Sequence, residues 1–140
     1  MLSTITVSSR GTMGTRTGNF LDGREQGWLQ ALAEGGPPEG PVVRSSFTRD
    51  GGYMAGQRLL SSAHKPTAIF ASSDMQGIGI LRALREAGLS VPSDMALASF
   101  DGSAEAEYSW PPLTSVEQPA TAMAEAAVTA LIGARRRHTA

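Results

Sequence analysis

Short apolar strands alternate with helical segments along this chain, and that alternation limits the possible folds more than any other feature. Five runs have strand character, at residues 5–7, 41–46, 67–71, 95–100 and 113–116. Helical periodicity is predicted over residues 20–33, 52–62, 73–87 and 121–133. A connection that contains a helix is long enough to cross over a sheet and start the next strand in the same direction. The pattern therefore predicts an α/β fold, with helices on both faces of a mainly parallel sheet.

The helix predicted over residues 73–87 has the clearest signals at its ends. Ser73 and Gln76 fit a capping box, in which a serine at the N-cap and a glutamine three residues later satisfy free backbone amides. Gly88 suits the left-handed position just beyond a helix end. Gly77 and Gly79 lie inside the helix, where we expect them to let it pack closely on the sheet.

Polar and aromatic residues follow several of the predicted strands. Sheets of this kind bind ligands at the carboxyl ends of their strands. The candidates at that edge are Arg24, Ser73 and Asp101, with Phe47 and Trp110 as candidate rings. Rigid, short polar side chains beside an aromatic ring suit a small ligand with many hydroxyl groups and one apolar face. Composition does not separate a sugar from another small polar molecule.

The residue inventory argues against several other kinds of site. The chain has no cysteine, and His64 and His138 lack partners at metal-ligand spacing, so we expect no metal. A G-x-S-x-G elbow is absent, and the G-x-G at Gly77 and Gly79 falls within a helix rather than before one. We therefore predict no cofactor and no enzymatic activity.

Charge and hydropathy limit the partners. The formal net charge is −1, and the basic cluster at residues 135–137 suits the C-terminus of a solvated helix. Strong nucleic-acid binding by these residues is therefore not expected. No apolar run approaches the roughly 20 residues that span a bilayer, and the N-terminus does not read as a secretory signal. A cytoplasmic protein with no membrane partner is the expectation.

Several ordered motifs in the chain closely resemble the lactose-repressor/galactose-repressor family of bacterial transcription regulators. The longest is PTAIFASSDMQGIGILRALREAGLSVPSDMALASFDG, followed by PPLTSVEQP. Upstream, LDGREQGWLQAL and SSFTRDGGYMAGQRLL resemble the family's first helix and its second strand, turn and helix. Together they cover about residues 21–131. The resemblance implies a three-layer αβα arrangement, similar to one lobe of the type I periplasmic-binding-protein-like fold.

The resemblance also implies how the chain is organised. Residues 1–140 are expected to form one effector-binding lobe: a strand and flexible loop (1–19), the α/β core (20–118), a return helix (119–134) and a tail (135–140). The family's helix-turn-helix, hinge and first core lobe have no counterpart in this sequence. Operator DNA would therefore be bound only through a domain that is missing here. A homodimer is expected.

The resemblance implies that five positions contact a small-molecule effector, and a sugar is the expected effector. They are Arg24, Phe47, Ser73, Asp101 and Gln118. A pentose, a hexose, a disaccharide or a purine all remain open, since family members differ in effector. The alternative function is a periplasmic-type sugar-binding protein fragment of a transporter, which has the same fold.

The last predicted helix, residues 121–133, has an apolar face. The resemblance implies that this helix normally returns to the first lobe. Because that lobe has no counterpart here, we expect the helix to dock on its own sheet or on a second copy of the chain.

Overall fold

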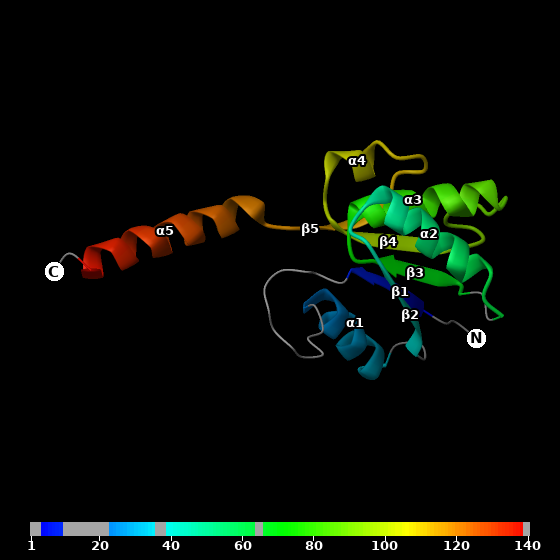
Figure 1. Cartoon of the computed structure of the whole chain (residues 1–140), viewed down its shortest axis with the longest axis horizontal. Coiled ribbons are helices and arrows are strands. Elements are labelled where there is room, and N and C mark those ends of the chain that lie inside the picture. Colours follow the sequence, from blue (N-terminus) through cyan, green and yellow to red (C-terminus); the bar gives the residue numbers. More distant parts are fainter. Residues whose placement is uncertain (1–3, 10–22, 36–38, 64–65, 139–140) are drawn as a thin grey trace.

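A computed structural model describes residues 4–9, 23–35, 39–63 and 66–138 (Figure 1). Residues 8–19 were expected to be a loop, but Ser8 and Ser9 belong to a strand, and the rest of that loop lies outside these ranges, as do Phe20 and His64. The chain order is β1 (Thr4–Ser9), α1 (Gly23–Ala33), β2 (Glu39–Ser45), α2 (Arg49–Leu60), β3 (Ala68–Ala71), α3 (Asp74–Glu86), β4 (Ala96–Asp101), α4 (Ala104–Glu107), β5 (Thr114–Glu117) and α5 (Ala120–His138).

The five strands form one sheet in the order β2-β1-β3-β4-β5, and every neighbouring pair is parallel. The predicted parallel α/β fold is confirmed. Helices α2 and α3 cover one face and α1 lies on the other, which gives three layers (Figure 1). Because all strands run in one direction, their carboxyl ends meet at a single edge of the sheet.

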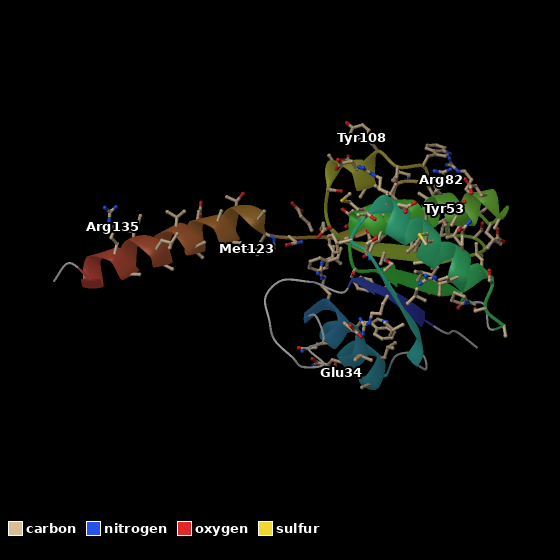
Figure 2. All side chains as sticks on the ribbon, viewed as in Figure 1. Glu34, Tyr53, Arg82, Tyr108, Met123 and Arg135 are labelled. Carbon is tan, nitrogen blue, oxygen red and sulfur yellow. The ribbon has the colours of Figure 1, made fainter. Side chains whose placement is uncertain are left out.

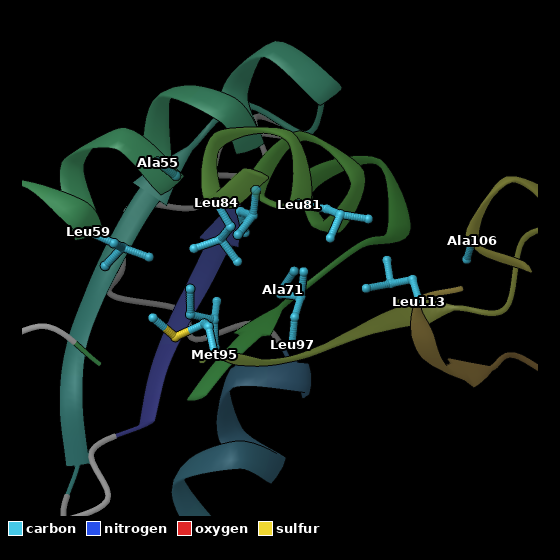
Figure 3. Packing of buried hydrophobic residues seen from close by; sticks show 11 residues of the cluster. Ala55, Leu59, Ala71, Leu81, Leu84, Met95, Leu97, Ala106 and Leu113 are labelled. Carbon is cyan, nitrogen blue, oxygen red and sulfur yellow. The ribbon is translucent and has the colours of Figure 1, made fainter. Parts of the chain in front are cut away.

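The core lies between the sheet and the pair α2 and α3 (Figure 3). Strands β3 and β4 alternate, so that Ile69, Ala71 and Leu97 point into this core while their neighbours point to the opposite face. The helices contribute mainly small and branched aliphatic side chains, among them Ala55, Leu59, Ile80, Leu81 and Leu84. This packing fixes the end of β3 and the start of α3, where part of the candidate site is located.

Glycines let α2 and α3 approach each other backbone to backbone. A Cβ added at Gly52 would overlap the carbonyl oxygen of Gln76, and one added at Gly79 would overlap the carbonyl oxygen of Arg49. Gly77 instead faces the side chain of Ser99 in the sheet. The expectation that both glycines of α3 serve packing on the sheet is therefore right for Gly77 and wrong for Gly79, which packs on α2.

The ends of α3 agree with the sequence, with one difference. The Oγ of Ser73 accepts a hydrogen bond from the amide of Gln76 at 3.2 Å, and Gly88 has a φ of 75° just beyond the helix. The amide of Leu89 donates to the carbonyl of Leu84 at 3.0 Å, which completes a Schellman C-cap. The Gln76 side chain does not complete the predicted capping box; its Nε2 donates to the Oγ of Ser45 instead.

Two other predicted boundaries differ from the structure. Helix α2 begins at Arg49, before the predicted residue 52, because the side chain of Thr48 accepts from the amide of Gly51 and caps the helix there. A short helix, α4, lies in the segment 103–112 that was expected to be a loop.

No helix in the described part of the chain has the length and hydropathy needed to cross a membrane.

Helix α5 projects away from the body of the molecule (Figure 1). Side chains along it, such as Met123 and Arg135, stand clear of the sheet and its helices (Figure 2). Only Gln118 and Pro119 separate it from β5, and the Gln118 amide donates to the carbonyl of Asp101. The expectation that this helix docks on its own sheet is wrong for this structure, since the chain leaves β5 in a direction that carries α5 away.

Candidate functional site

The candidate site is the edge of the sheet where the strands end. It takes Arg24 from the first turn of α1, Phe47 from the loop after β2, Asp101 from the end of β4 and Gln118 from just after β5. These side chains are partly or fully exposed. The parallel direction of β2, β4 and β5 accounts for their presence at one edge.

Arg24 is held in place by a carbonyl group and two aromatic rings. Its Nη1 donates to the carbonyl oxygen of Ser72 at 2.7 Å. The guanidinium carbon lies 5.3 Å from the ring centroid of Phe47 and 5.7 Å from that of Phe100. Both distances are within the range of cation–π contact. These contacts fix the orientation of the guanidinium group, which has five N–H donors. Arg24 is half-buried at the edge.

The neighbouring residue Glu25 anchors α1 to the sheet. Its buried carboxylate accepts two hydrogen bonds from the guanidinium of Arg44 on β2, at 2.5 and 2.6 Å. Hydrogen bonding to this carboxylate raises the pKa of Arg44, against the opposing effect of burial. A bidentate pair of this kind fixes both distance and angle. It therefore sets where the first turn of α1, with Arg24, lies over the sheet.

Asp101 lies at the carboxyl end of β4 in an unusual backbone conformation. Its φ is 139°, and it is followed by Gly102 with a φ of 72°. Its carboxylate accepts from the amide of Asp74 at 3.3 Å and from the Nε2 of Gln118 at 2.6 Å. Among the described residues, Asp101 is the one non-glycine residue with a positive φ. Strain of this sort is commonly found where a side chain must be presented to a ligand.

The buried carboxylate of Asp74 lies next to the edge and accepts hydrogen bonds from residues that follow or belong to β4 and β5. Its Oδ1 accepts from the hydroxyls of Ser99 and Ser115, both at 2.5 Å, and its Oδ2 accepts from the amide of Ser103 at 2.6 Å. Burial would raise the pKa of Asp74, but these hydrogen bonds outweigh burial and lower it below its ordinary value. Asp74 thereby ties α3 to β4 and β5.

The structure brings most, but not all, of the predicted residues to the open edge. Arg24, Phe47, Asp101 and Gln118 are gathered there. Ser73 is 0% exposed and its hydroxyl caps α3, so it does not face the solvent side of the edge. Trp110, a candidate ring, is 78% exposed but borders a hollow beside α3 with Ile78, Arg82 and Arg85.

Sequence reasoning did not assign Phe100 a role of its own. Its ring packs against Arg24 and, with Trp28, Phe70 and Val116, borders an apolar hollow of about 430 Å³ beside α1. The signal was present in MALASF, because Phe100 occupies an outward position in a strand whose alternate residues are buried.

Within the part of the chain that the structure covers, no group of histidine, aspartate and glutamate side chains gathers as metal ligands do.

Comparison with known proteins decides the family. The model of the periplasmic binding protein-like domain matches residues 4–139, nearly the whole chain. This chain belongs to the periplasmic binding protein-like domain family. The HTH-type transcriptional repressor PurR of Klebsiella pneumoniae (strain 342) is 38% identical to it over 112 residues. That match covers 79% of this chain and 33% of the repressor, so the chain spans about a third of the length of the curated relatives it matches.

Comparison with solved structures agrees with this result. A structure described as a transcriptional regulator CelR-cellobiose complex is 42% identical, with a TM-score of 0.65, over 69% of this chain and 30% of that one. A LacI family transcription regulator from Clostridium acetobutylicum has a TM-score of 0.79 over 97% of this chain and 50% of that one. At 20% identity, that second likeness shows the fold alone. The resemblance to the LacI/GalR effector-binding core is thus confirmed.

Proposed function

We propose that this chain is the effector-binding lobe of a LacI-type transcription regulator and that its effector is a small sugar. The observation that carries the proposal is the edge itself: a fixed guanidinium, Arg24, and a strained carboxylate, Asp101, lie with aromatic rings at the carboxyl end of a parallel sheet. The cellobiose complex of a regulator 42% identical to this chain supports a sugar.

Each residue has a distinct part in the proposed site. The Arg24 guanidinium donates to hydroxyl or ring oxygens, and Asp101 accepts from hydroxyl groups, since a carboxylate offers about four acceptor positions and the structure uses two. Gln118 adds an amide beside Asp101. Phe47, 40% exposed, offers an edge or face to the apolar side of the sugar. Ser73 contributes indirectly, because it fixes the start of α3.

The regulatory part of the proposal follows from the relatives. They are transcription repressors and regulators, which favours a cytoplasmic regulator over the periplasmic transport alternative. In this proposal the lobe acts as one half of a ligand cleft in a homodimer, and operator DNA is contacted through a separate helix-turn-helix domain. The lobe itself is non-enzymatic. The cellobiose complex of the 42% identical regulator favours a sugar over a purine as the effector.

A thermal-shift titration tests the proposed ligand class. Cellobiose and a panel of mono- and disaccharides are titrated to high concentration, beside a parallel panel of purine bases. A sugar present at 100 times its Kd stabilises the folded state by about 2.7 kcal/mol, so the midpoint rises by several degrees. Arg24→Ala and Asp101→Asn each remove most of that rise, because each removes hydrogen bonds to the ligand.

Arg58→Ala is the matched control for this titration, because Arg58 lies in the last turn of α2 and is exposed away from the edge. It keeps the full sugar response. Asn is chosen at position 101 because it tolerates a positive φ better than most residues. A response to purines alone refutes the sugar assignment, and a sugar response that survives both site variants refutes the proposed contacts.

A further inference from the structure

A buried amide side chain, that of Gln76, lies behind the edge and has no part in the proposed ligand contacts. Gln76 is in the first turn of α3 and is 0% exposed, so its side chain does not reach a ligand at the edge. Its Oε1 accepts from the hydroxyls of Ser72 and Ser73, at 2.9 and 3.3 Å. Its Nε2 donates to the Oγ of Ser45 at 3.0 Å and to the carbonyl oxygen of Ser46 at 3.2 Å. An amide group has two N–H donors and two acceptor positions, and all four are used here.

These partners also fix which way round the amide lies. The carbonyl oxygen of Ser46 can only accept, so it must face Nε2 of Gln76 rather than Oε1. The hydroxyls of Ser72 and Ser73 are then free to donate to Oε1. A buried polar network in which every hydrogen bond is made is rigid, whereas one with a missing partner is costly. The amide of Gln76 therefore holds its neighbours in one arrangement.

This network joins two strands that are not neighbours in the sheet. Ser45 is the last residue of β2, and Ser72 directly follows β3. Strand β1 lies between β2 and β3, so the sheet connects those two strands only through β1 (Figure 1). The side chain of Gln76 connects their carboxyl ends directly, because its Nε2 binds one end and its Oε1 binds the other.

The same two strand ends carry the contacts that orient Arg24. The carbonyl oxygen of Ser72 accepts from Nη1 of Arg24 at 2.7 Å. Phe47 follows Ser46 in the chain, and its ring centroid lies 5.3 Å from the guanidinium carbon of Arg24. The guanidinium can meet both groups at once only if the ends of β2 and β3 keep their present spacing.

We propose that Gln76 is a positioning residue of the effector site. Its amide holds the ends of β2 and β3 at the spacing that lets Arg24 bind the carbonyl of Ser72 and the ring of Phe47 together. This inference rests on the proposed function and deepens it, since it concerns the same site. It adds that effector affinity depends on a residue that the effector does not contact.

The rival explanation is that Gln76 serves only the packing of α2 on α3. The backbone of Gln76 does contact α2, since a Cβ added at Gly52 would overlap its carbonyl oxygen. A residue with that role alone would affect stability without changing the surroundings of Arg24. The test therefore needs a readout at Arg24 itself.

Proton NMR of the ligand-free chain supplies that readout. The guanidinium carbon of Arg24 lies 5.3 Å from the ring centroid of Phe47 and 5.7 Å from that of Phe100, so its Nε–H and Cδ protons should carry ring-current shifts. Gln76→Met keeps the length of the side chain and removes its hydrogen bonds. We expect the Arg24 signals of this variant to move toward those of a solvent-exposed arginine.

A milder variant and a control accompany Gln76→Met. Ser72→Ala removes a hydroxyl that binds Gln76 but keeps the carbonyl that Arg24 uses, so it should move the Arg24 signals in the same direction by less. It decides the test if Gln76→Met does not fold. Leu59→Ala is the control, because Leu59 is buried in the last turn of α2, at the end of that helix away from the edge. It lowers stability through a core cavity and should leave the Arg24 signals unchanged.

A thermal-shift titration with cellobiose gives the second readout. We expect Gln76→Met to weaken cellobiose binding at least tenfold although Arg24 and Asp101 are both present, and Leu59→Ala to keep the affinity of the wild type. If no sugar shifts the wild type, the proposed function is wrong, and the Arg24 signals still decide the positioning role. Arg24 signals that stay in place in Gln76→Met and Ser72→Ala, or an unchanged cellobiose affinity in a folded Gln76→Met chain, would overturn the proposal.

Discussion

Replacing Gly79 by alanine is expected to prevent stable folding of the lobe. The added Cβ would overlap the carbonyl oxygen of Arg49 and crowd the amide of Tyr53, both of which are backbone atoms of α2. Neither atom can move without shifting the whole helix. Overpacking of a tight core costs about 1–3 kcal/mol when side chains can adjust, and a backbone overlap costs more. Against a total stability of about 5–15 kcal/mol, the loss is large.

Urea unfolding followed by circular dichroism measures this loss. Gly27→Ala serves as the control, because Gly27 is also within a helix but has open space where the Cβ would go. It should leave stability unchanged or raise it by a few tenths of a kcal/mol to about 1 kcal/mol. If Gly79→Ala unfolds at the same urea concentration as Gly27→Ala, the close crossing of α2 and α3 is incorrect.

The second large effect is expected from Asp74→Asn. Asparagine keeps the shape of the side chain, but only its single carbonyl oxygen accepts, whereas Asp74 accepts from three donors: the hydroxyls of Ser99 and Ser115 and the amide of Ser103. A buried donor then lacks an acceptor, and the charge-assisted bonds are lost. We expect a loss of about 3 kcal/mol. Asp94→Asn, at an exposed carboxylate that accepts one amide hydrogen bond from Ser90, should cost under about 1 kcal/mol.

The pH dependence of stability gives an independent readout of Asp74. Its pKa is lowered in the folded state, so its contribution is fully present above the unfolded value near 3.8 and is lost as the pH falls through the lowered value. The difference in stability between the wild type and Asp74→Asn should therefore be constant at neutral pH and shrink below about pH 4. Curves that stay parallel from about pH 6 to pH 3 would contradict this role.

The sequence predicted the sheet and most helices because their signals are local. Alternation in MALASF, the serine at position 73 and the glycine at position 88 each act through neighbours a few residues away. Because the strands are parallel, Arg24, Phe47 and Asp101 could be predicted to lie at one edge before any side-chain contact was known. This is why the predicted edge residues lie close together in the structure.

The parts that sequence reasoning missed depend on contacts between distant residues. The pairing of Gln76 with Ser45, the packing of Gly79 on α2 and the stacking of Phe100 on Arg24 each join separate elements. Ser73 was assigned a ligand contact from its position after a strand, but helix capping turns its hydroxyl inward. The direction of α5 likewise follows from how Gln118 is bound to Asp101, which no local pattern encodes.

A small hydroxylated ligand is expected to bind at the edge formed by Arg24 and Asp101. A ¹H–¹⁵N correlation spectrum recorded during a cellobiose titration tests it most directly, because chemical shifts detect weak binding to a single lobe. We expect the largest shifts at the amides of Arg24, Asp74, Asp101, Gly102 and Gln118. Shifts that gather elsewhere, for example along α2, or a spectrum unchanged by every sugar of the panel, would contradict it.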